Sequence, residues 1–346
     1  MVRPNVDDYF GDWKQREALV QEMIPAIGRL FSQRNVGMLI YGRPLHNRSV
    51  TFIMKAHRFV RQIERNEMSE FESHPVLMAL AKLDLWHVQI DLGKLTVRFM
   101  EHQEEKGDAA QGVDEFVQGE LAYLDGVNEK PIKKCQHVVL YGFGRIGRLM
   151  ARLLIERTST AEIMQLKAIV VRPGDEGDLQ KRASLFMNDS VHGAFQGTLR
   201  VDEQSNSLIA NGNEIKVIYA NSPEEIDYTQ YGIEDAMIID NTGMWRDRAG
   251  LSRHLEAKGA AKVLLTAPGK GDMKNIVYGI NDDQIAAEDT IITAASCTTN
   301  AIAPVLKVVN DRFGIVKGHV ETVHAYTNDQ NLIDNYHKGS RRGRSA

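Results

Sequence analysis

The chain has 346 residues, 43% of them hydrophobic and 25% charged, and a formal net charge of −4 at pH 7. These values are typical of a globular protein with two or more domains. They give no reason to expect nucleic acid or an anionic membrane as a partner. The two cysteines, Cys135 and Cys297, are too few for a disulfide framework, and we see no apolar signal core or membrane-spanning run. We therefore expect a cytoplasmic protein.

Residues 1–134 show apolar positions at helical spacing. Ser49 is a suitable N-cap for a helix whose apolar face includes Ile53 and Val60. Another helix is predicted from Leu77 to Phe99, where apolar residues alternate by four and three. The histidines of this segment show no metal-binding spacing, so no metal site is predicted. We interpret residues 1–134 as a helical module for packing or oligomerisation.

A glycine-rich motif follows the first apolar strand pattern. His137–Tyr141 reads as a buried strand, the sequence Gly142-Phe-Gly144-Arg-Ile-Gly147 follows it, and an amphipathic helix comes next. In a dinucleotide-binding loop the first glycine allows the tight turn and the second lets the backbone approach a pyrophosphate. The third lets the helix pack on the strand, with its N-terminus facing the phosphates. The strand, loop and helix together predict dinucleotide binding.

The next predicted strand, residues 166–171, ends at an unexpected residue. An acidic side chain is typical there, because it binds the ribose hydroxyls of the adenosine. This chain has Arg172 instead, with Asp175 and Glu176 just beyond as replacements. An arginine here is suited to a 2′-phosphate, which favours NADP. A solvated loop arginine is the alternative, and the sequence leaves both open.

Strands alternate with helices through the rest of the middle segment, and Asn211-Gly212 predicts a hairpin turn. This pattern indicates a doubly wound parallel sheet, whose ligands bind at the carboxyl ends of the strands. The candidate positions at such ends are Gly142, Arg172, Thr242, Gly243, Thr266 and Cys297.

Cys297 lies between an apolar strand pattern, residues 290–295, and a helix pattern, residues 301–309. A sulfur at such an elbow is close to the first N–H groups of the helix, which favour negative charge and lower the pKa of a thiol. Cys297 is therefore a candidate nucleophile. Residues 315–326 read as a long strand that includes His324.

Four sequence motifs, taken together, resemble those of a known enzyme family. Gly-Phe-Gly-Arg-Ile-Gly, Ser-Cys-Thr-Thr-Asn, Thr-Val-His-Ala-Tyr-Thr-Asn-Asp-Gln and Arg-Arg-Gly-Arg occur in this order over residues 136–346. Together they closely resemble phosphorylating glyceraldehyde-3-phosphate dehydrogenase. Residues 1–134 resemble the helical N-terminal extension of some bacterial members. Tyr141 replaces the usual asparagine, and Arg172 replaces the usual ribose-binding aspartate, which leaves cofactor preference open.

The resemblance implies an α/β fold in three parts. A Rossmann-type doubly wound parallel sheet (135–296) follows an all-α extension (1–134) and precedes the beginning of an α+β catalytic domain (297–346). Because the catalytic domain of the family continues further, we expect this sequence to be a C-terminally truncated form. The family also implies a homotetramer.

The resemblance assigns roles residue by residue. The nucleophile falls on Cys297 and the base on His324. Contacts to substrate or phosphate fall on Ser296, Thr298, Thr327 and Arg342, with Arg344 as an alternative to Arg342. Contacts to NAD or NADP fall on Arg145, Ile146 and Thr266, beside the loop glycines.

The implied reaction is the phosphorylating oxidation of glyceraldehyde 3-phosphate through a cysteine thioester, a step of glucose metabolism, with a phosphorylated aldehyde and inorganic phosphate as the small-molecule partners. Two alternatives stay open. One is erythrose-4-phosphate dehydrogenase, which uses the same covalent chemistry with hydrolytic release. The other is a dinucleotide-binding or assembly module without turnover.

Overall fold

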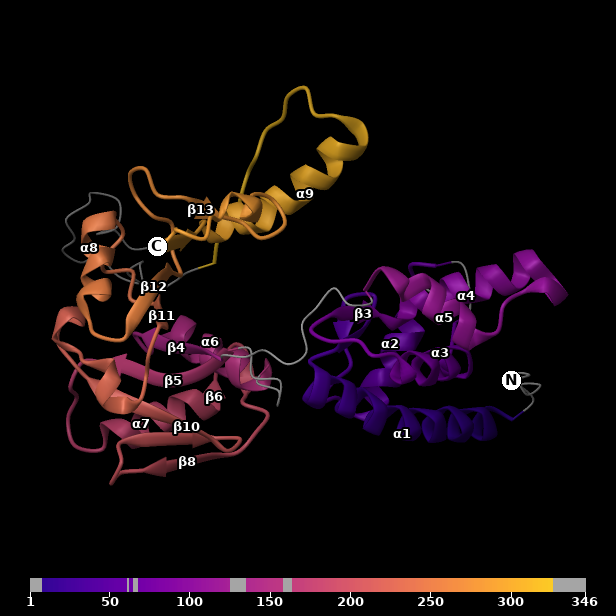
Figure 1. Cartoon of the computed structure of the whole chain (residues 1–346), viewed down its shortest axis with the longest axis horizontal. Helices are drawn as coiled ribbons and strands as arrows, with labels where there is room; N and C mark the ends of the chain where they lie inside the picture. Colours follow the sequence, from indigo (N-terminus) through magenta and orange to yellow (C-terminus); the bar gives the residue numbers. More distant parts are fainter. Residues whose placement is uncertain (1–7, 61, 65–67, 125–134, 158–163, 326–346) are drawn as a thin grey trace.

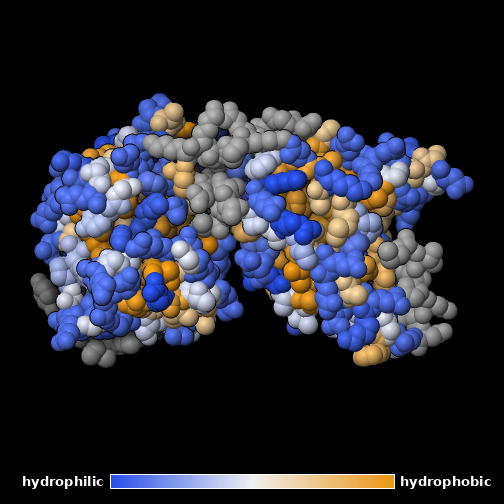
Figure 2. Space-filling view, turned by 60° about the horizontal axis from the view of Figure 1, so that its bottom comes forward, coloured by the Kyte–Doolittle hydropathy of each residue, from blue (hydrophilic) through white to orange (hydrophobic). Residues whose placement is uncertain are grey.

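The computed structural model describes residues 8–60, 62–64, 68–124, 135–157 and 164–325. Figure 1 shows two bodies, one built from the N-terminal helices and one around a large sheet. Each has its own hydrophobic core: one core gathers residues between Val20 and Leu121, and the other clusters gather residues after Val138. The face shown in Figure 2 is mostly hydrophilic over both bodies, with scattered apolar patches.

The N-terminal body is helical, as expected, and also contains a small sheet. The sheet has the strand order β2-β1-β3, with β1 and β3 parallel. Its elements are α1 (Tyr9–Arg34), β1 (Gly37–Ile40), β2 (Arg43–Pro44), α2 (Val50–Val60), α3 (Glu70–Lys82), β3 (Gln89–Asp91), α4 (Leu92–Lys106) and α5 (Val113–Leu121).

The single helix predicted from Leu77 to Phe99 is wrong, because two helices share this segment. α3 ends at Lys82, and its C-cap Leu83 is extended. His87 has a positive φ of 50°, which a continuous helix does not allow. Asp91 then starts α4 by accepting a hydrogen bond from the N–H of Lys94. Apolar spacing is similar in one long helix and in two helices that pack on the same core, so the spacing did not reveal the break.

The second body is a nine-stranded sheet with the order β13-β14-β12-β11-β4-β5-β10-β9-β8. Neighbours from β13 to β10 are parallel, and β10, β9 and β8 form an antiparallel edge. The strands are β4 (Gln136–Tyr141), β5 (Met164–Val171), β8 (Leu199–Asp202), β9 (Ser207–Ala210), β10 (Asn213–Tyr219), β11 (Ala236–Asp240), β12 (Ala260–Leu265), β13 (Asn275–Ile276) and β14 (Ile291–Ala294). The remaining elements are α6 (Arg145–Arg157), α7 (Asp178–Met187), the short pair β6 (Asn188–Asp189) and β7 (Gly193–Ala194), α8 (Arg248–Ser252) and α9 (Cys297–Phe313).

Strand β4 shows why the sheet is buried on both faces. Val138 and Leu140 point into the core shared with α6 and α7, whereas Val139 and Tyr141 point into the core on the opposite face. Successive side chains of a strand alternate between faces, so a strand covered on both sides is apolar throughout. The Rossmann-type doubly wound sheet predicted from the sequence is therefore present.

The strand order reverses at β4. The chain passes from β4 to β5 on one side and later returns to place β11 on the other side. In sheets of this kind the crevice at the carboxyl ends of the two diverging strands is where ligands bind. The point of reversal here lies at the ends of β4 and β11, where Tyr141 and Asp240 are paired in register.

The segment after the sheet differs in part from prediction. α9 begins at Cys297, as the elbow implied, and Figure 1 shows it extending away from the sheet. The strand predicted for residues 315–326 is wrong over its described part, because residues 315–325 are exposed and form no strand. An extended segment becomes a strand only when a neighbour satisfies its N–H and C=O groups, and the described residues supply no such neighbour.

Candidate active site

The glycine-rich loop has the tight geometry that its sequence predicted. Gly142 has a φ of +93°, and a Cβ added to it would lie 2.9 Å from Cγ2 of Thr242. A Cβ on Gly147 would lie 2.3 Å from the carbonyl oxygen of Gly142, so only glycine allows α6 to approach this closely. Gly144 has open space around its ideal Cβ position. That space suits the close approach of a pyrophosphate, so the loop fits a dinucleotide.

The strand ends meet at one edge of the sheet. Tyr141 pairs with Asp240, Asp240 with Leu265, and Leu265 with Thr293, so these four residues form a row across β4, β11, β12 and β14. The residues just beyond this row include the predicted site positions Gly142, Thr242, Gly243, Thr266 and Cys297. The topology therefore places the glycine loop and the cysteine elbow on the same side of the sheet, at the carboxyl ends of its parallel strands.

Asp240 organises the turn after β11, and the sequence analysis did not single it out. Its Oδ1 accepts hydrogen bonds from the backbone N–H and the hydroxyl of Thr242, both at 2.7 Å. Its Oδ2 lies 3.0 Å from Nε2 of His254, and both side chains are fully buried. The hydroxyl of Thr266 donates to the carbonyl oxygen of Asp240 at 3.0 Å. An aspartate at a strand end followed by Thr-Gly was the available signal, because such residues bond the backbone two positions on.

Arg172 lies just beyond β5 and is exposed. Its Nη2 is 3.8 Å from the sulfur of Met244, and no described carboxylate lies within ion-pair distance. The next arginine in the chain, Arg182, is instead paired with Asp178 at 2.6 Å. Among the described residues, the Arg172 guanidinium therefore has no carboxylate partner, and it lies where the fold places the adenosine ribose.

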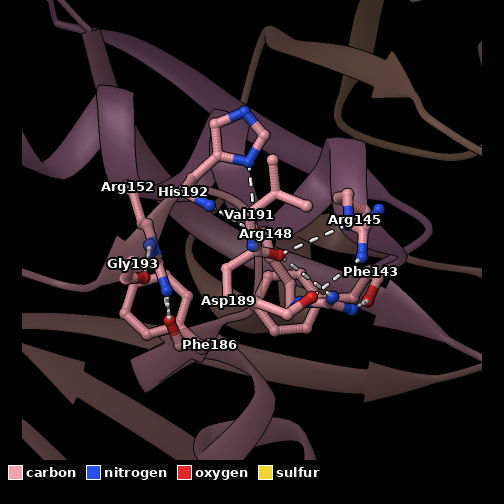
Figure 3. Close-up of polar contacts among 10 residues, drawn as sticks. Phe143, Arg145, Arg148, Arg152, Phe186, Asp189, Val191, His192 and Gly193 are labelled. Atoms are coloured by element: carbon pink, nitrogen blue, oxygen red, sulfur yellow. Dashed lines mark hydrogen bonds and ion pairs between the residues drawn. The ribbon is translucent and has the colours of Figure 1, made fainter. Parts of the chain in front are cut away.

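Arg145, the arginine of the glycine motif, belongs to a second cluster that the sequence did not reveal (Figure 3). Asp189 has a side-chain exposure of 3%, and its Oδ2 lies 3.4 Å from Nε of Arg145 and 3.8 Å from Nη2 of Arg148. Its Oδ1 accepts from the backbone N–H groups of His192 and Val191, at 2.9 and 3.0 Å. These amide bonds, followed by the ring of His192 at 3.1 Å and then by Arg145, hold the pKa of Asp189 well below its usual range.

A buried arginine, Arg152, holds the segment around Asp189 in place. Arg152 donates to the carbonyl oxygen of Phe186 from Nε at 2.9 Å and to that of Gly193 from Nη1 at 2.9 Å. Figure 3 shows that these contacts tie α6 to the segment that carries Asp189. The anchored segment therefore holds a carboxylate beside the side chain of Arg145.

Cys297 is the first residue of α9. Ser296 is the N-cap, and its Oγ accepts from the N–H of Thr299 at 3.1 Å. Cys297 is exposed, and Thr298 beside it is half-buried. The free N–H groups of a helix N-terminus carry partial positive charge, which stabilises a thiolate.

His324 completes a thiol–imidazole pair. Its Nε2 lies 3.2 Å from Sγ of Cys297, and its Nδ1 lies 2.7 Å from the carbonyl oxygen of Ala325. A carbonyl oxygen only accepts hydrogen bonds, so Nδ1 carries the proton and Nε2 is free to take one from the thiol. The hydrogen bond to His324 is the main cause that lowers the pKa of Cys297, and the same bond raises the pKa of His324.

The remaining predicted residues are distributed as follows. Ile146 is exposed at the start of α6, and Gly243 has a φ of +63° in the turn after β11. Thr327, Arg342 and Arg344 lie outside the described residues.

Among the described residues, no three His, Cys, Asp or Glu side chains are grouped to hold a metal ion. Their helices also include none with the length and hydropathy needed to cross a membrane.

Comparison with known proteins agrees with this architecture. Residues 136–248 match the family model described as glyceraldehyde 3-phosphate dehydrogenase, NAD binding domain, and residues 296–346 match the corresponding C-terminal domain. The chain is 57% identical over 326 residues to a glyceraldehyde-3-phosphate dehydrogenase-like protein of Pseudomonas aeruginosa, covering 94% of this chain and 70% of that protein. It is 44% identical to glyceraldehyde-3-phosphate dehydrogenase of Thermotoga maritima and 39% identical to that of Zymomonas mobilis. Each of these matches covers 60% of this chain, and the chain covers 60% and 59% of these two relatives.

The fold and the glycine loop define an NAD-binding protein of the Rossmann type, with a thiol–imidazole pair on the same sheet edge. Within that class, the chain belongs to the glyceraldehyde-3-phosphate dehydrogenase family. The match to the Pseudomonas protein leaves 20 of the 346 residues outside it, so it includes most of the N-terminal body as well.

Proposed function

We propose that this protein oxidises a phosphorylated aldehyde, glyceraldehyde 3-phosphate, with inorganic phosphate as the second substrate. The observation that carries the proposal is the 3.2 Å contact between Cys297 Sγ and His324 Nε2 at the N-terminus of α9. A lone cysteine is not evidence of catalysis. A thiol with a lowered pKa, a base directed at it, and a dinucleotide loop on the same sheet edge are the parts that this reaction needs.

The chemistry follows from the two side chains. The Cys297 thiolate attacks the aldehyde carbon and forms a carbon–sulfur bond, and the His324 imidazolium gives its proton to the carbonyl oxygen, so the adduct is a neutral hemithioacetal and His324 is again a base. His324 takes the hydroxyl proton of that adduct, and general base help of this kind contributes roughly 10²–10⁴-fold. A bound nicotinamide supplies the acceptor for the hydride. Phosphate then attacks the resulting thioester and releases an acyl phosphate, and the sulfur leaves as the thiolate.

The proposed cofactor contacts come from the chain itself. The loop from Gly142 to Gly147 binds the pyrophosphate at the N-terminus of α6, and Thr242 lines the crevice beside it. NAD fits this site, and the free guanidinium of Arg172 adds a site for the 2′-phosphate of NADP. We therefore propose that the protein accepts both dinucleotides. On family resemblance alone, we extend the proposal to a cytoplasmic homotetramer.

The test is a spectrophotometric assay of the protein with glyceraldehyde 3-phosphate, with NAD or NADP, and with or without phosphate. We expect phosphate-dependent reduction of the dinucleotide, abolished in Cys297→Ser and lowered in His324→Asn. Reduction that does not need phosphate and prefers erythrose 4-phosphate would instead support the tetrose-phosphate alternative. Dinucleotide binding without turnover, in a protein whose Cys297 reacts no faster than an ordinary thiol, would refute the proposal.

A further inference from the structure

The N-terminal body has an uneven distribution of charge that the net charge of the chain conceals. Residues 23–63 contain no aspartate or glutamate. The basic residues of this stretch are Arg29, Arg34, Arg43, Arg48, Lys55, Arg58 and Arg61. Ordinary surfaces mix both signs of charge, so a segment of this length with one sign is a candidate to contact an anionic partner.

Four of these cations surround the exposed face of α2. Arg43 lies over the ring of Phe59, with its guanidinium carbon 3.7 Å from the ring centroid, and Arg48 lies over the ring of Phe52 at 4.9 Å. Lys55 and Arg58 are exposed on the helix between and beside the two rings. Phe52 and Phe59 are seven residues apart, so they lie on one side of the helix at a separation of about 10 Å. We call Arg43, Arg48, Phe52, Lys55, Arg58 and Phe59 the α2 face.

The cations of the α2 face have no described carboxylate within ion-pair distance, whereas several other cations of the same body do. Arg16 pairs with Asp12 and Glu70. Lys82 pairs with Asp114, and Arg98 with Glu120. Cation–π stacking fixes the two arginines on the α2 face without neutralising them, which lowers the entropy cost of binding an anion there.

We propose that the α2 face binds single-stranded nucleic acid. Phosphates pair with the arginines through charge-assisted bonds, and unpaired bases stack on the guanidinium and phenyl planes. An acidic peptide would use the charge but not the planar surfaces. An anionic membrane fits poorly, because membrane-binding helices insert large apolar side chains, and α2 exposes none; Ile63, which is 50% exposed, follows the helix.

The test measures fluorescence anisotropy of a labelled short oligothymidylate with the full chain. Each phosphate contact on a single strand contributes about −0.7 to the slope of log K against log salt. Four cations therefore predict a slope of roughly −3, which is about a fifty-fold loss of affinity between 50 and 200 mM salt. Saturating NAD should leave binding unchanged, because the α2 face is not part of the dinucleotide crevice.

Matched variants separate the α2 face from the rest of the surface. Arg43→Gln with Arg48→Gln should halve the slope and weaken binding at low salt at least tenfold. Lys94→Gln with Lys106→Gln removes the same charge from exposed positions of α4 and should have little effect. Arg43→Lys with Arg48→Lys keeps the charge and loses the planar stack, so affinity should fall while the slope stays the same.

Several results would overturn the proposal. They are no binding to the oligothymidylate at low salt, equal losses in the α2-face and α4 variants, and competition by NAD. Equal or tighter binding of duplex DNA, of polyglutamate or of phosphatidylserine vesicles would assign the charge to a different kind of partner and would also overturn it.

Discussion

Sγ of Cys297 and Nε2 of His324 lie 3.2 Å apart, although 27 residues separate them in the chain. Cys297 starts a helix, and His324 lies in an extended segment whose described residues form no strand. The contact between Nδ1 of His324 and the carbonyl oxygen of Ala325 fixes the tautomer that directs Nε2 at the sulfur. The pair therefore links the first residue of a helix to an extended segment that belongs neither to that helix nor to the sheet.

The glycine loop offers a matched pair of substitutions. Gly147→Ala places a Cβ 2.3 Å from the carbonyl oxygen of Gly142, so it should destabilise the fold by about 1–3 kcal/mol. Gly144→Ala meets no atom within 4 Å, so the thermal midpoint should stay close to that of the parent protein. The dinucleotide affinity should nevertheless fall in Gly144→Ala, because the methyl group occupies the approach of the pyrophosphate. Calorimetry and a binding titration check both, and unchanged affinity in Gly144→Ala would contradict this placement of the phosphates.

Asp189 is predicted to position Arg145 for the cofactor. Asp189→Asn removes the charge that Arg145 faces at 3.4 Å, and we expect the KM for the dinucleotide to rise roughly tenfold while kcat changes little. Asp202→Asn is the matched control, because Asp202 also accepts backbone N–H bonds in a turn but forms no ion pair with a described arginine. A rise in KM that is equal in both variants would show that Asp189 has only a structural role.

Arg172 is predicted to decide between the two dinucleotides. Arg172→Asp replaces a cation with the type of residue that binds ribose hydroxyls, so kcat/KM with NADP should fall roughly tenfold or more. The kcat/KM with NAD should stay unchanged or rise. Lys181→Gln, an exposed cation on α7, is the control and should leave the ratio of the two values unchanged. If the ratio is the same in the parent protein and Arg172→Asp, the arginine faces solvent in the complex.

The N-terminal body should lose stability in mild acid because of His57. This residue is 1% exposed. Its Nδ1 bonds the carbonyl oxygen of Ile53 at 2.8 Å and its Nε2 bonds Ser73 Oγ at 2.6 Å, so both nitrogens of the neutral ring have partners. Burial lowers the pKa of His57 below its ordinary value, with Glu70 opposing the shift. The neutral ring thus contributes fully to the free energy of unfolding above about pH 6.5, the pKa of histidine in the unfolded chain. This contribution is lost as the pH falls toward the lower pKa of the folded state.

Thermal unfolding at pH 5 and pH 7.5 checks this prediction. The parent protein should melt lower at pH 5. His57→Gln should melt lower than the parent at pH 7.5 and show a smaller difference between the two pH values. His319→Gln, at an exposed position, should behave like the parent. An equal pH dependence in the parent and in His57→Gln would assign the acid sensitivity to other groups.

Sequence patterns predicted the parts of this molecule that depend on near neighbours in the chain. The β4–loop–α6 unit, the hairpin at Asn211-Gly212 and the start of α9 follow from local spacing and glycine placement. The break between α3 and α4 was missed because both helices present apolar residues to one core. The turn that Asp240 forms with Thr242 could have been read from Asp-Asn-Thr-Gly at the strand end. The pairing of Asp189 with Arg145 and of Asp240 with His254 was missed because tertiary contacts create both.

The ionisation of Cys297 tests the central claim most directly. The rate of alkylation by iodoacetamide is measured against pH, and peptide mapping by mass spectrometry separates Cys297 from Cys135. Imidazolium stabilises the thiolate, so the midpoint for Cys297 should lie below the ordinary value of about 8.5 and should move back toward it in His324→Asn. A midpoint at or above 8.5 in the parent protein, or one that His324→Asn leaves unchanged, would contradict the thiolate–imidazolium pair on which the proposed catalysis depends.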